Sequence, residues 1–526
     1  MNAKRIVLIL LAFLLPALAC NMPTAPAGPP AGDPRVADAV QQTLAARIVE
    51  TAGVPPNFTP DPNEPLPIVT ILPEMMTPLP GVPDAPHLTP VPVLIGDTYQ
   101  YPIQPGDTLA ALAGRFGVQP QQILDPQQYP PQMMLPAGQT LLIPNVLGQP
   151  GESALLLPDT EIVYSPAVAD FDTHAFVEQS GGYLSTFTER VGTETLSGAE
   201  IVERVALETS VNPRLLLAFL EYRSGWVFGR PDAPNIAFPI GFYASKMEGL
   251  QKEMTLVARQ LQVGYYGWRS GKFTELEFLG GSRMRVAPTV NPGTVAVQNL
   301  FAKLYKPDEW RGELYDPAQF LAFYAERFGD PWARYAQIGP VIPDRLAQPE
   351  IELPFPAGEP WVFTGGPHAA WGIGSPLGGL DFAPANVEKG CEVSRFWVTS
   401  SANGVVLRSE RGMVLLDLDG DGQEGTGWVL LYLHVAEKDR VAVGTRVSVN
   451  DPLGHPSCEG GFSTGTHVHI TRKYNGEWIG VEGPIPFVMS GWTAFAGAKA
   501  YSGSLTKGDQ VVNARPDGSS KSIITR

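Results

Sequence analysis

The chain has 526 residues, of which 44% are hydrophobic and 17% charged, so it can hold about three or four domains with real cores. Its 37 basic and 53 acidic residues give a formal net charge of −16, which argues against nucleic acid as a partner, because such a surface does not neutralise phosphates. Three cysteines exclude a disulfide-dense mini-protein and a four-cysteine zinc site.

Residues 1–20 have the pattern of an export signal peptide. Lys4 and Arg5 precede an almost wholly apolar run, which is too short to span a bilayer comfortably and ends in small residues before Cys20. Cys20 resembles the lipid-receiving cysteine of bacterial lipoproteins, although the same small residues would equally serve an ordinary signal peptidase. We therefore expect the protein to work outside the cytoplasm, in the cell envelope, with a lipid on Cys20 as its membrane anchor.

Residues 21–97 are rich in proline, alanine, glycine, threonine and aspartate. A segment of this composition buries little and prefers extended polyproline geometry. The sequence therefore predicts a semi-rigid, Pro-rich linker between the anchor and the globular part.

A compact unit is predicted at 98–145. Gly106-Asp107-Thr108-Leu109 reads as the end of a strand followed by a helix cap, and Gly138 as a turn before a final strand. The resulting order of strand, helix, helix and strand resembles a LysM module, a small βααβ domain. The resemblance implies binding to N-acetylglucosamine polymers such as peptidoglycan.

Residues 153–348 are predicted to form a mainly α-helical middle domain. Within it, 211–221 resembles the first helix of lytic transglycosylases and other lysozyme-like folds, in which a buried Glu acts as general acid. Glu221 is thus a candidate second catalytic acid, and an ordinary helix-end Glu is the alternative. Apolar residues at three-to-four spacing mark helices at 201–207, 213–222, 247–263, 295–305 and 317–328.

Residues 350–490 change to short β-like runs separated by turns, which predicts an antiparallel all-β domain. Five of the seven histidines of the chain lie here, at 368, 434, 455, 467 and 469. The His467-x-His469 pair on a strand places both imidazoles on one face, and Asp381 lies between apolar strand residues. Imidazoles and a carboxylate with one open position form the ligand set of a hydrolytic zinc site.

Three segments in this order, around Asp381, His434 and His467-x-His469, resemble the LytM-type (lysostaphin-like, M23 family) zinc metallopeptidases. The resemblance implies zinc bound by His368, Asp381 and His469, with His434 and His467 activating water and stabilising the oxyanion. It also implies cleavage of peptide bonds in peptidoglycan stems or bridges. The usual His-x-x-x-Asp spacing is altered, because His368 lies thirteen residues before Asp381, and His455 is a fallback ligand.

Three further features belong to the C-terminal part of the chain. Cys391 and Cys458 are an even pair that predicts one disulfide, with a reactive thiol as the alternative. Asp417, Asp419 and Asp421 resemble the start of a calcium loop, and a solvated hairpin tip is the alternative interpretation. Residues 491–526 are expected to be a C-terminal extension, which the sequence does not assign to or exclude from the sheet.

The expected function is a secreted zinc endopeptidase that hydrolyses peptide crosslinks of peptidoglycan and is held to the wall by its LysM module. A second possibility is a LytM-like wall-binding or activator protein without activity, which the unusual spacing before Asp381 keeps open. A third is a bifunctional hydrolase in which Glu221 also cleaves glycan.

Overall fold

The structure is a computed structural model that describes residues 92–124, 128–244, 246–385 and 390–526. All of them belong to one compact unit, which spans Asp84–Arg526. The expected signal peptide, Cys20 and nearly all of the expected linker lie outside the described residues. Among the residues that the structure describes, no helix is both long enough and apolar enough to cross a membrane.

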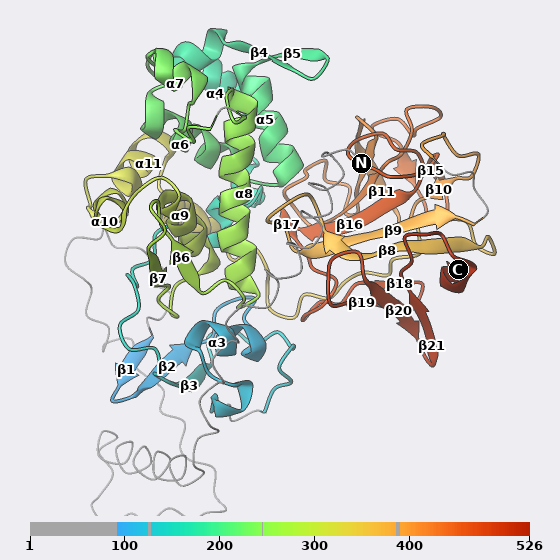
Figure 1. The fold of residues 1–526 in the computed structure, drawn as a ribbon, viewed down its shortest axis with the longest axis horizontal. Coiled ribbons are helices and arrows are strands. Elements are labelled where there is room, and N and C mark those ends of the chain that lie inside the picture. The colour runs from blue at the N-terminus through green and yellow to red at the C-terminus, as the bar shows by residue number, and fades with distance from the viewer. Residues whose placement is uncertain (1–91, 125–127, 245, 386–389) are drawn as a thin grey trace, which may run out of the picture. The chain divides into compact units, whose positions relative to one another are not determined.

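Residues 93–144 contain a three-stranded antiparallel sheet and the helix α3 (Leu109–Phe116) (Figure 1). Thr108 caps α3, since its hydroxyl accepts a hydrogen bond from the N–H of Ala111 at 3.1 Å. Gly117 ends the helix in the left-handed conformation. The strands lie in the order β1 (Val93–Ile95), β2 (Thr98–Pro102) and β3 (Thr140–Pro144).

This segment differs from the expected βααβ order in two ways. The second helix is a single 3₁₀ turn, η2 (Pro120–Gln122), because Ile123 is already extended and Leu124 bridges Leu142 in β3. An additional strand, β1, pairs with β2 and lies within the range that the sequence assigned to the linker.

The middle of the chain is mainly helical, and the five predicted helical segments overlap α5, α6, α8, α9 and α11. Two short hairpins, which the sequence did not predict, interrupt the helices. The elements in this part are η3 (Asp159–Glu161), η4 (Pro166–Val168), α4 (Thr173–Ser180), η5 (Tyr183–Thr186), β4 (Thr188–Val191), β5 (Glu194–Ser197), α5 (Gly198–Thr209), α6 (Pro213–Ser224), α7 (Ala233–Ala237), α8 (Leu250–Arg269), β6 (Glu275–Glu277), β7 (Arg283–Arg285), α9 (Pro292–Ala302), α10 (Pro307–Tyr315), α11 (Phe320–Phe328) and α12 (Pro331–Ile338).

Side-chain caps explain where two of these helices begin. Ser197 and Glu200 form a capping box at the start of α5, each side chain bonding the backbone N–H of the other residue. Asn212 caps α6 through the N–H of Arg214, and Pro213 follows at the first helical position, where no N–H is needed. Both helices carry many buried apolar residues, so the packing of these side chains stabilises the helices beyond their caps.

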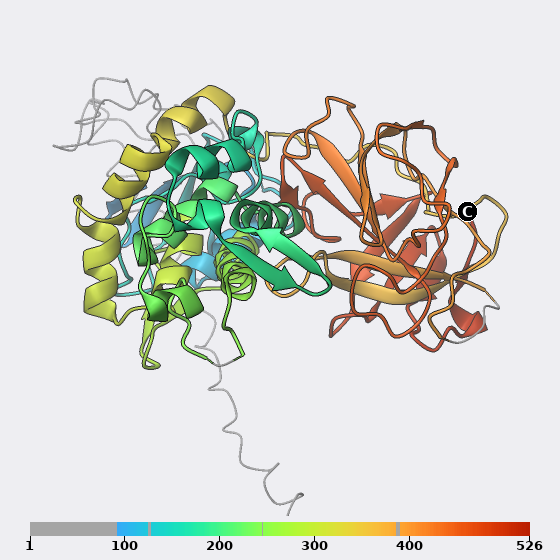
Figure 2. The same cartoon turned by 90° about the horizontal axis from the view of Figure 1, so that it is seen from above.

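The C-terminal part contains a nine-stranded antiparallel sheet. Strands β8 and β9 form a long antiparallel pair within it (Figures 1 and 2). The strand order is β14 (Arg446–Val447), β11 (Gly404–Glu410), β12 (Met413–Asp417), β13 (Trp428–Leu433), β16 (Val468–Tyr474), β9 (Leu377–Pro384), β8 (Trp361–Ala369) and β22 (Ile523–Ile524), with β17 (Glu477–Trp478) paired to β16.

Two smaller sheets accompany it, and one of them includes the expected C-terminal extension. The first pairs β10 (Val398–Thr399) with β15 (Pro452–Gly454). The second has the order β18 (Val488–Met489), β19 (Trp492–Ala496), β20 (Gly503–Lys507) and β21 (Gln510–Asn513). The boundary expected at 490 therefore falls inside the β18–β19 hairpin. Because β22, after η6 (Ser520–Ser522), also pairs with β8, residues 491–526 are part of the sheet domain.

The two faces of the large sheet bury different partners. On β16, Val468 and Ile470 face one core of the sheet domain, so His469 lies on the opposite face. That opposite face carries Leu431 and Trp478, which share a continuous core with the helices of the middle domain. The candidate ligand His469 therefore lies on the sheet face that also packs against the helical part.

A buried ion pair strengthens the contact between helix and sheet. Arg269, at the end of α8, reaches Glu477 in β17 with two nitrogen–oxygen distances of 3.0 and 2.9 Å. The hydroxyl of Tyr265 donates to the same carboxylate at 2.7 Å. Burial raises the pKa of Glu477, although the charge of Arg269 and the Tyr265 bond act in the opposite direction.

Candidate metal centre

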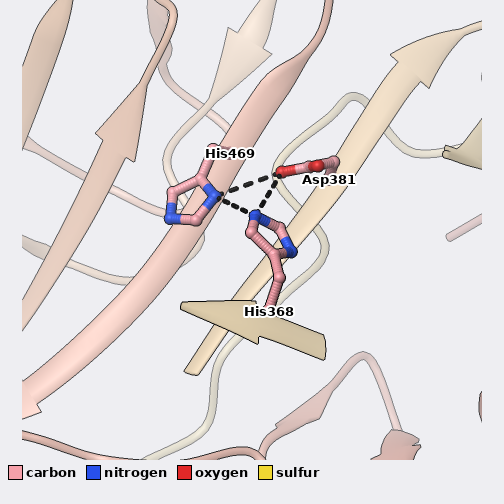
Figure 3. A group of neighbouring side chains, drawn as sticks. All are labelled: His368, Asp381 and His469. Atoms are coloured by element: carbon pink, nitrogen blue, oxygen red, sulfur yellow. Dashed lines mark hydrogen bonds and ion pairs between the residues drawn. The ribbon is translucent and has the colours of Figure 1, made fainter. Parts of the chain in front are cut away.

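Three side chains that the sequence proposed as metal ligands converge on one point (Figure 3). His368 comes from β8, Asp381 from β9 and His469 from β16, and all three are buried. Nε2 of His368 lies 2.9 Å from Nδ1 of His469, and Oδ1 of Asp381 lies 3.3 and 3.1 Å from these two nitrogens. Three neighbouring strands thus bring the three potential ligand atoms into a compact triangle.

The hairpin of β8 and β9 explains the unusual spacing between His368 and Asp381. In the antiparallel register, Gly365 faces Asp381 and His368 faces Gly379. The two ligands are therefore diagonal neighbours on adjacent strands, and the residues between them form the connecting loop and the ends of the strands. The register shifts at three places between Phe363 and Ala369, so an irregular strand pairing brings the ligands together across the thirteen-residue separation.

Two glycines on the same hairpin leave room for the ligands. A Cβ atom on Gly379 would lie 2.1 Å from Cε1 of His469, and one on Gly365 would lie 2.2 Å from Oδ2 of Asp381. Any larger residue would displace a ligand, because a glycine within a strand is the residue that permits such a close approach. The Gly365-Gly366 and Gly378-Gly379 pairs are thus a signal of this site in the sequence, in addition to its histidines and Asp381.

Backbone carbonyls fix the tautomers of the two candidate ligand histidines. Nδ1 of His368 bonds the carbonyl of Gly366 at 2.8 Å, and Nε2 of His469 bonds that of Ala370 at 3.2 Å. Each carbonyl requires a proton on that nitrogen, so the other ring nitrogen directs its lone pair at Asp381. Two lone pairs and a carboxylate that face each other at these distances call for a cation between them.

Burial and the contacts among the three side chains shift the pKa of each of them. Burial would raise the pKa of Asp381, but its contacts with His368 and His469 outweigh burial and hold the pKa well below its usual range. Burial also lowers the pKa of His469. At His368 burial acts in the same direction, yet Asp381 raises the pKa on balance.

The donor set and its dimensions fit zinc. In a tetrahedral zinc site with bonds of about 2.0–2.1 Å, the ligand atoms lie about 3.3 Å from one another. The three distances here, 2.9, 3.1 and 3.3 Å, are close to that value. Two imidazoles and one carboxylate leave a fourth position for water or substrate, which is the pattern of a catalytic rather than a structural zinc site.

The two other predicted histidines lie beside this triangle. Nε2 of His467 is 3.7 Å from Oδ1 of Asp381, and the rings of His467 and His434 are 4.5 Å apart. Nδ1 of His467 bonds the Gly465 carbonyl at 2.8 Å, and Nδ1 of His434 bonds the Glu459 carbonyl at 2.7 Å. Both rings therefore keep Nε2 free as a proton acceptor.

His434 has a strained backbone conformation and an imidazole with a lowered pKa. Its backbone has φ of +66°, a left-handed conformation that costs a non-glycine residue about 1–2 kcal/mol. Burial, assisted by His467, lowers the pKa of its imidazole to about 4. His434 is thus neutral at ordinary pH, as a proton acceptor must be.

Tyr501 belongs to the site although the sequence analysis did not single it out. It lies between β19 and β20, and its ring stacks on His368 with the ring centroids 4.1 Å apart. Its backbone also bonds both Gly366 and Pro367, next to His368. No local pattern marks this tyrosine, because its place depends on the fold of the second sheet.

The remaining candidate residues lie elsewhere. Nδ1 of His455 bonds the Phe396 carbonyl, and the ring packs 4.0 Å from that of Trp397, so it is not among the converging ligands. Oε2 of Glu221 accepts hydrogen bonds from the N–H groups of Val227 and Phe228 at 2.7 and 2.9 Å. These contacts give Glu221 a structural part in holding the loop after α6.

The structure places the predicted disulfide and the predicted calcium loop as follows. Cys391 and Cys458 are joined by a disulfide. The carboxylates of Asp417, Asp419 and Asp421 lie close together in the loop after β12. Both oxygens of Asp417 already accept backbone N–H groups, from Gly420 at 3.0 Å and from Gly422 at 2.9 Å, which is how a tight acidic turn is held without an ion.

Two family models match the chain. The model of the LysM domain matches residues 101–144. The model of the LasA N-terminal domain matches residues 155–341, which is the greater part of the helical middle domain. The family model found for the middle domain is therefore that of the LasA N-terminal domain, whereas the sequence of 211–221 had suggested a lysozyme-like fold.

Three known proteins are similar to parts of this chain. Protease LasA of Pseudomonas aeruginosa is 25% identical over 350 residues, which cover 63% of this chain and 76% of LasA. The beta-lytic metalloendopeptidase of Achromobacter lyticus is 29% identical over 159 residues, 29% of this chain and 39% of that protein. A solved structure, the M23 metalloprotease pseudoalterin, shows 23% identity and a TM-score of 0.28, over 34% of this chain and 99% of pseudoalterin.

The chain therefore combines a LysM domain with a LasA N-terminal domain, and it is homologous to the protease LasA and to beta-lytic metalloendopeptidase.

Proposed function

We propose that this protein is a zinc-dependent endopeptidase that hydrolyses peptide crosslinks of bacterial peptidoglycan. One observation carries the proposal: His368, Asp381 and His469 converge as a three-ligand site, and the imidazoles of His434 and His467 lie beside it. The relatives named as a protease and a metalloendopeptidase support peptide hydrolysis as the reaction. The LysM domain supports peptidoglycan as the substrate.

Different residues of the site bind the metal and transfer the proton. A zinc ion held by His368, Asp381 and His469 would supply Lewis acidity toward the scissile carbonyl and toward water. Nε2 of His467, 3.7 Å from Asp381, accepts the proton of the attacking water. Once protonated, the same Nε2 donates that proton to the leaving amine.

His434 completes the proton-transfer pair. Its Nδ1–H is held by Glu459, so its Nε2 also faces the reacting groups as an acceptor. Because the pKa of His434 is about 4, a proton on this ring is readily passed on. His434, whose ring lies 4.5 Å from that of His467, is thus a second proton acceptor beside the one that carries the proton.

The other domains place the reaction in the cell envelope. The LysM domain holds N-acetylglucosamine strands of the wall, which raises the local concentration of crosslinks at the metal centre. An export signal in residues 1–20 carries the chain out of the cytoplasm, and a lipid on Cys20 anchors it to the membrane. The Pro-rich segment that follows acts as the spacer.

The first experiment tests the assigned roles with purified peptidoglycan as the substrate. Release of free amino groups is measured for the wild type, for His467→Ala and for His174→Ala, a matched control whose exposed imidazole pairs with Glu203. We expect His467→Ala to lose at least about 100-fold in rate and His174→Ala to retain the wild-type rate. Equal rates in all three proteins would overturn the assignment.

The second experiment tests the metal ligands without relying on activity. Zinc per chain is measured by atomic emission for the wild type, for His368→Ala and for His455→Ala. We expect about one zinc in the wild type and in His455→Ala, and none in His368→Ala. Loss of zinc only in His455→Ala would assign the ligand to that residue. No zinc in any of the three proteins would favour a wall-binding protein without activity.

A further inference from the structure

The Cys391–Cys458 disulfide lies between the contacts that hold both non-ligand histidines. Cys458, one of its two cysteines, lies in the segment that positions His434. The N–H of Ser457 bonds the His434 carbonyl at 2.7 Å, and the carbonyl of Glu459 accepts from Nδ1 of His434 at 2.7 Å. The residues on either side of Cys458 therefore fix both the backbone and the ring of His434.

These contacts matter because His434 has a left-handed backbone. A non-glycine residue keeps φ of +66° only where its surroundings hold it there. Ser457 supplies a second bond, from its hydroxyl to the same His434 carbonyl at 3.1 Å. Release of the segment around Cys458 would let His434 relax to an ordinary backbone conformation and turn its ring away.

Cys391, the other cysteine, lies in the segment that holds the residue before His467. The carbonyl of Gly390 accepts from the N–H of Thr466 at 2.8 Å, and the carbonyl of Glu392 accepts from its hydroxyl at 2.5 Å. Gly390 and Glu392 are the two neighbours of Cys391, and Thr466 directly precedes His467. The residues on either side of Cys391 therefore fix the approach of the chain to His467.

The three candidate metal ligands are held in a different way. His469 and Asp381 are a directly paired couple in the β16–β9 ladder, and His368 is held in the β8–β9 hairpin. The rings of His368 and His469 bond the carbonyls of Gly366 and Ala370, which lie on that hairpin. None of these bonds passes through the segments that flank the two cysteines.

We propose that the Cys391–Cys458 disulfide is the positioning device for His434 and His467, and that the metal ligands do not depend on it. Cys391 and Cys458 are thus positioning residues that act through Thr466 and through Ser457 and Glu459. The role in turnover rests on the proposed peptidase function. The effect on the two imidazoles does not, because it concerns only the geometry of this chain.

The test uses the full chain with both cysteines replaced, Cys391→Ser together with Cys458→Ser. We expect zinc to stay at about one per chain, KM to stay within about twofold, and kcat to fall by about 10–100-fold, since small displacements of reacting groups have effects of that size. An unchanged kcat would overturn the proposal. Loss of zinc together with kcat would also overturn it, because the bridge would then be a general structural support.

A second variant keeps the test decisive if the double variant does not fold. Thr466→Val preserves the shape of the side chain and the disulfide but removes the hydroxyl that bonds Glu392. We expect kcat to fall several-fold with zinc retained. The matched control is Thr255→Val, whose hydroxyl bonds a helix carbonyl within α8, and we expect it to behave as the wild type. Identical kcat in both threonine variants would contradict the proposal.

A readout without turnover separates this proposal from the proposed function. In 15N-histidine-labelled protein, two-bond 1H–15N spectra report which ring nitrogen carries the proton. We expect the disulfide variant to lose the fixed Nδ1–H pattern of His434 and His467 and to keep that of His368 and His469. Unchanged patterns at His434 and His467 would refute the positioning role. A wild type that neither binds zinc nor cleaves peptide would refute only the function.

Discussion

The ring of Tyr501 lies nearly parallel to the ring of His368, with 4.1 Å between the ring centroids and 17° between the planes. Tyr501 is far from His368 along the chain. It reaches the metal centre because the β19–β20 turn packs on β8, where the N–H of Tyr501 bonds the Pro367 carbonyl. The aromatic face thereby packs against the imidazole of a candidate metal ligand.

The first prediction concerns this stack. Tyr501→Ala should raise the dissociation constant for zinc by about 2–10-fold, because an aromatic contact of this kind is worth about 0.5–1.5 kcal/mol. Tyr501→Phe, which keeps the ring, should bind zinc as the wild type does. Competition with a chelator of known affinity measures both constants. Equal weakening in the two variants would show that the hydroxyl, and not the stack, supports His368.

The second prediction concerns stabilisation by the metal. Free zinc at about one hundred times its dissociation constant should stabilise the protein by about 2.7 kcal/mol, because it binds the folded form. Asp381→Asn should abolish this gain, since the amide cannot replace the buried carboxylate between two imidazoles. Thermal unfolding with and without zinc measures the difference. Asp419→Asn, in the acidic loop after β12, is the matched control and should keep the full gain.

The third prediction concerns acid stability of the metal-free protein. The folded pKa of His434 is about 4, below its ordinary value of 6.5, so between these values the unfolded chain binds the proton and the folded protein does not. Stability from this group is therefore present at neutral pH and is lost as pH falls from 6.5 toward 4. At about pH 5 the loss should be about 2 kcal/mol.

Urea unfolding at about pH 7.5 and about pH 5 tests that sign. The free energy of unfolding of the wild type should drop by about 2 kcal/mol more than that of His434→Gln, which has no group to titrate there. His174→Gln, at an exposed site, should drop as much as the wild type. An equal drop in wild type and His434→Gln would contradict the lowered pKa.

The fourth prediction concerns the ion pair between α8 and β17. Arg269→Leu should lower the free energy of unfolding by about 3–5 kcal/mol, because it leaves the buried carboxylate of Glu477 without its cation. Arg327→Leu, at a half-exposed arginine, should change it by about 0.5 kcal/mol or less. Chemical unfolding followed by tryptophan fluorescence measures both. A small effect at Arg269 would mean that Tyr265 alone satisfies Glu477.

Local sequence patterns predicted much of the helical part. Apolar residues at three-to-four spacing mark segments that overlap α5, α6, α8, α9 and α11. They failed at the second helix of the LysM segment, where Ile123 and Leu124 leave the helix to join the sheet. The pairing of Leu124 with Leu142 in a distant strand outweighed the local helical preference there. The spacing of apolar residues along the chain cannot predict such a pairing.

The sequence by itself determined which residue types could form the metal centre. The His467-x-His469 pair follows from the period of a strand, and the structure brings both rings to Asp381. The disulfide partners followed from simple counting, since only two cysteines are left when Cys20 is set aside. These inferences needed only local geometry or composition.

Only the tertiary structure decided which side chains meet. The β8–β9 register brings His368 to Asp381 across thirteen residues, the β19–β20 turn supplies Tyr501, and β22 attaches the C-terminal segment to the sheet. The structure likewise gives Glu221 two backbone partners in the loop after α6. The physical reason is common to all of these: strand register and packing between sheets are set by contacts between distant parts of the chain, whereas sequence periodicity reports only neighbours within a few residues.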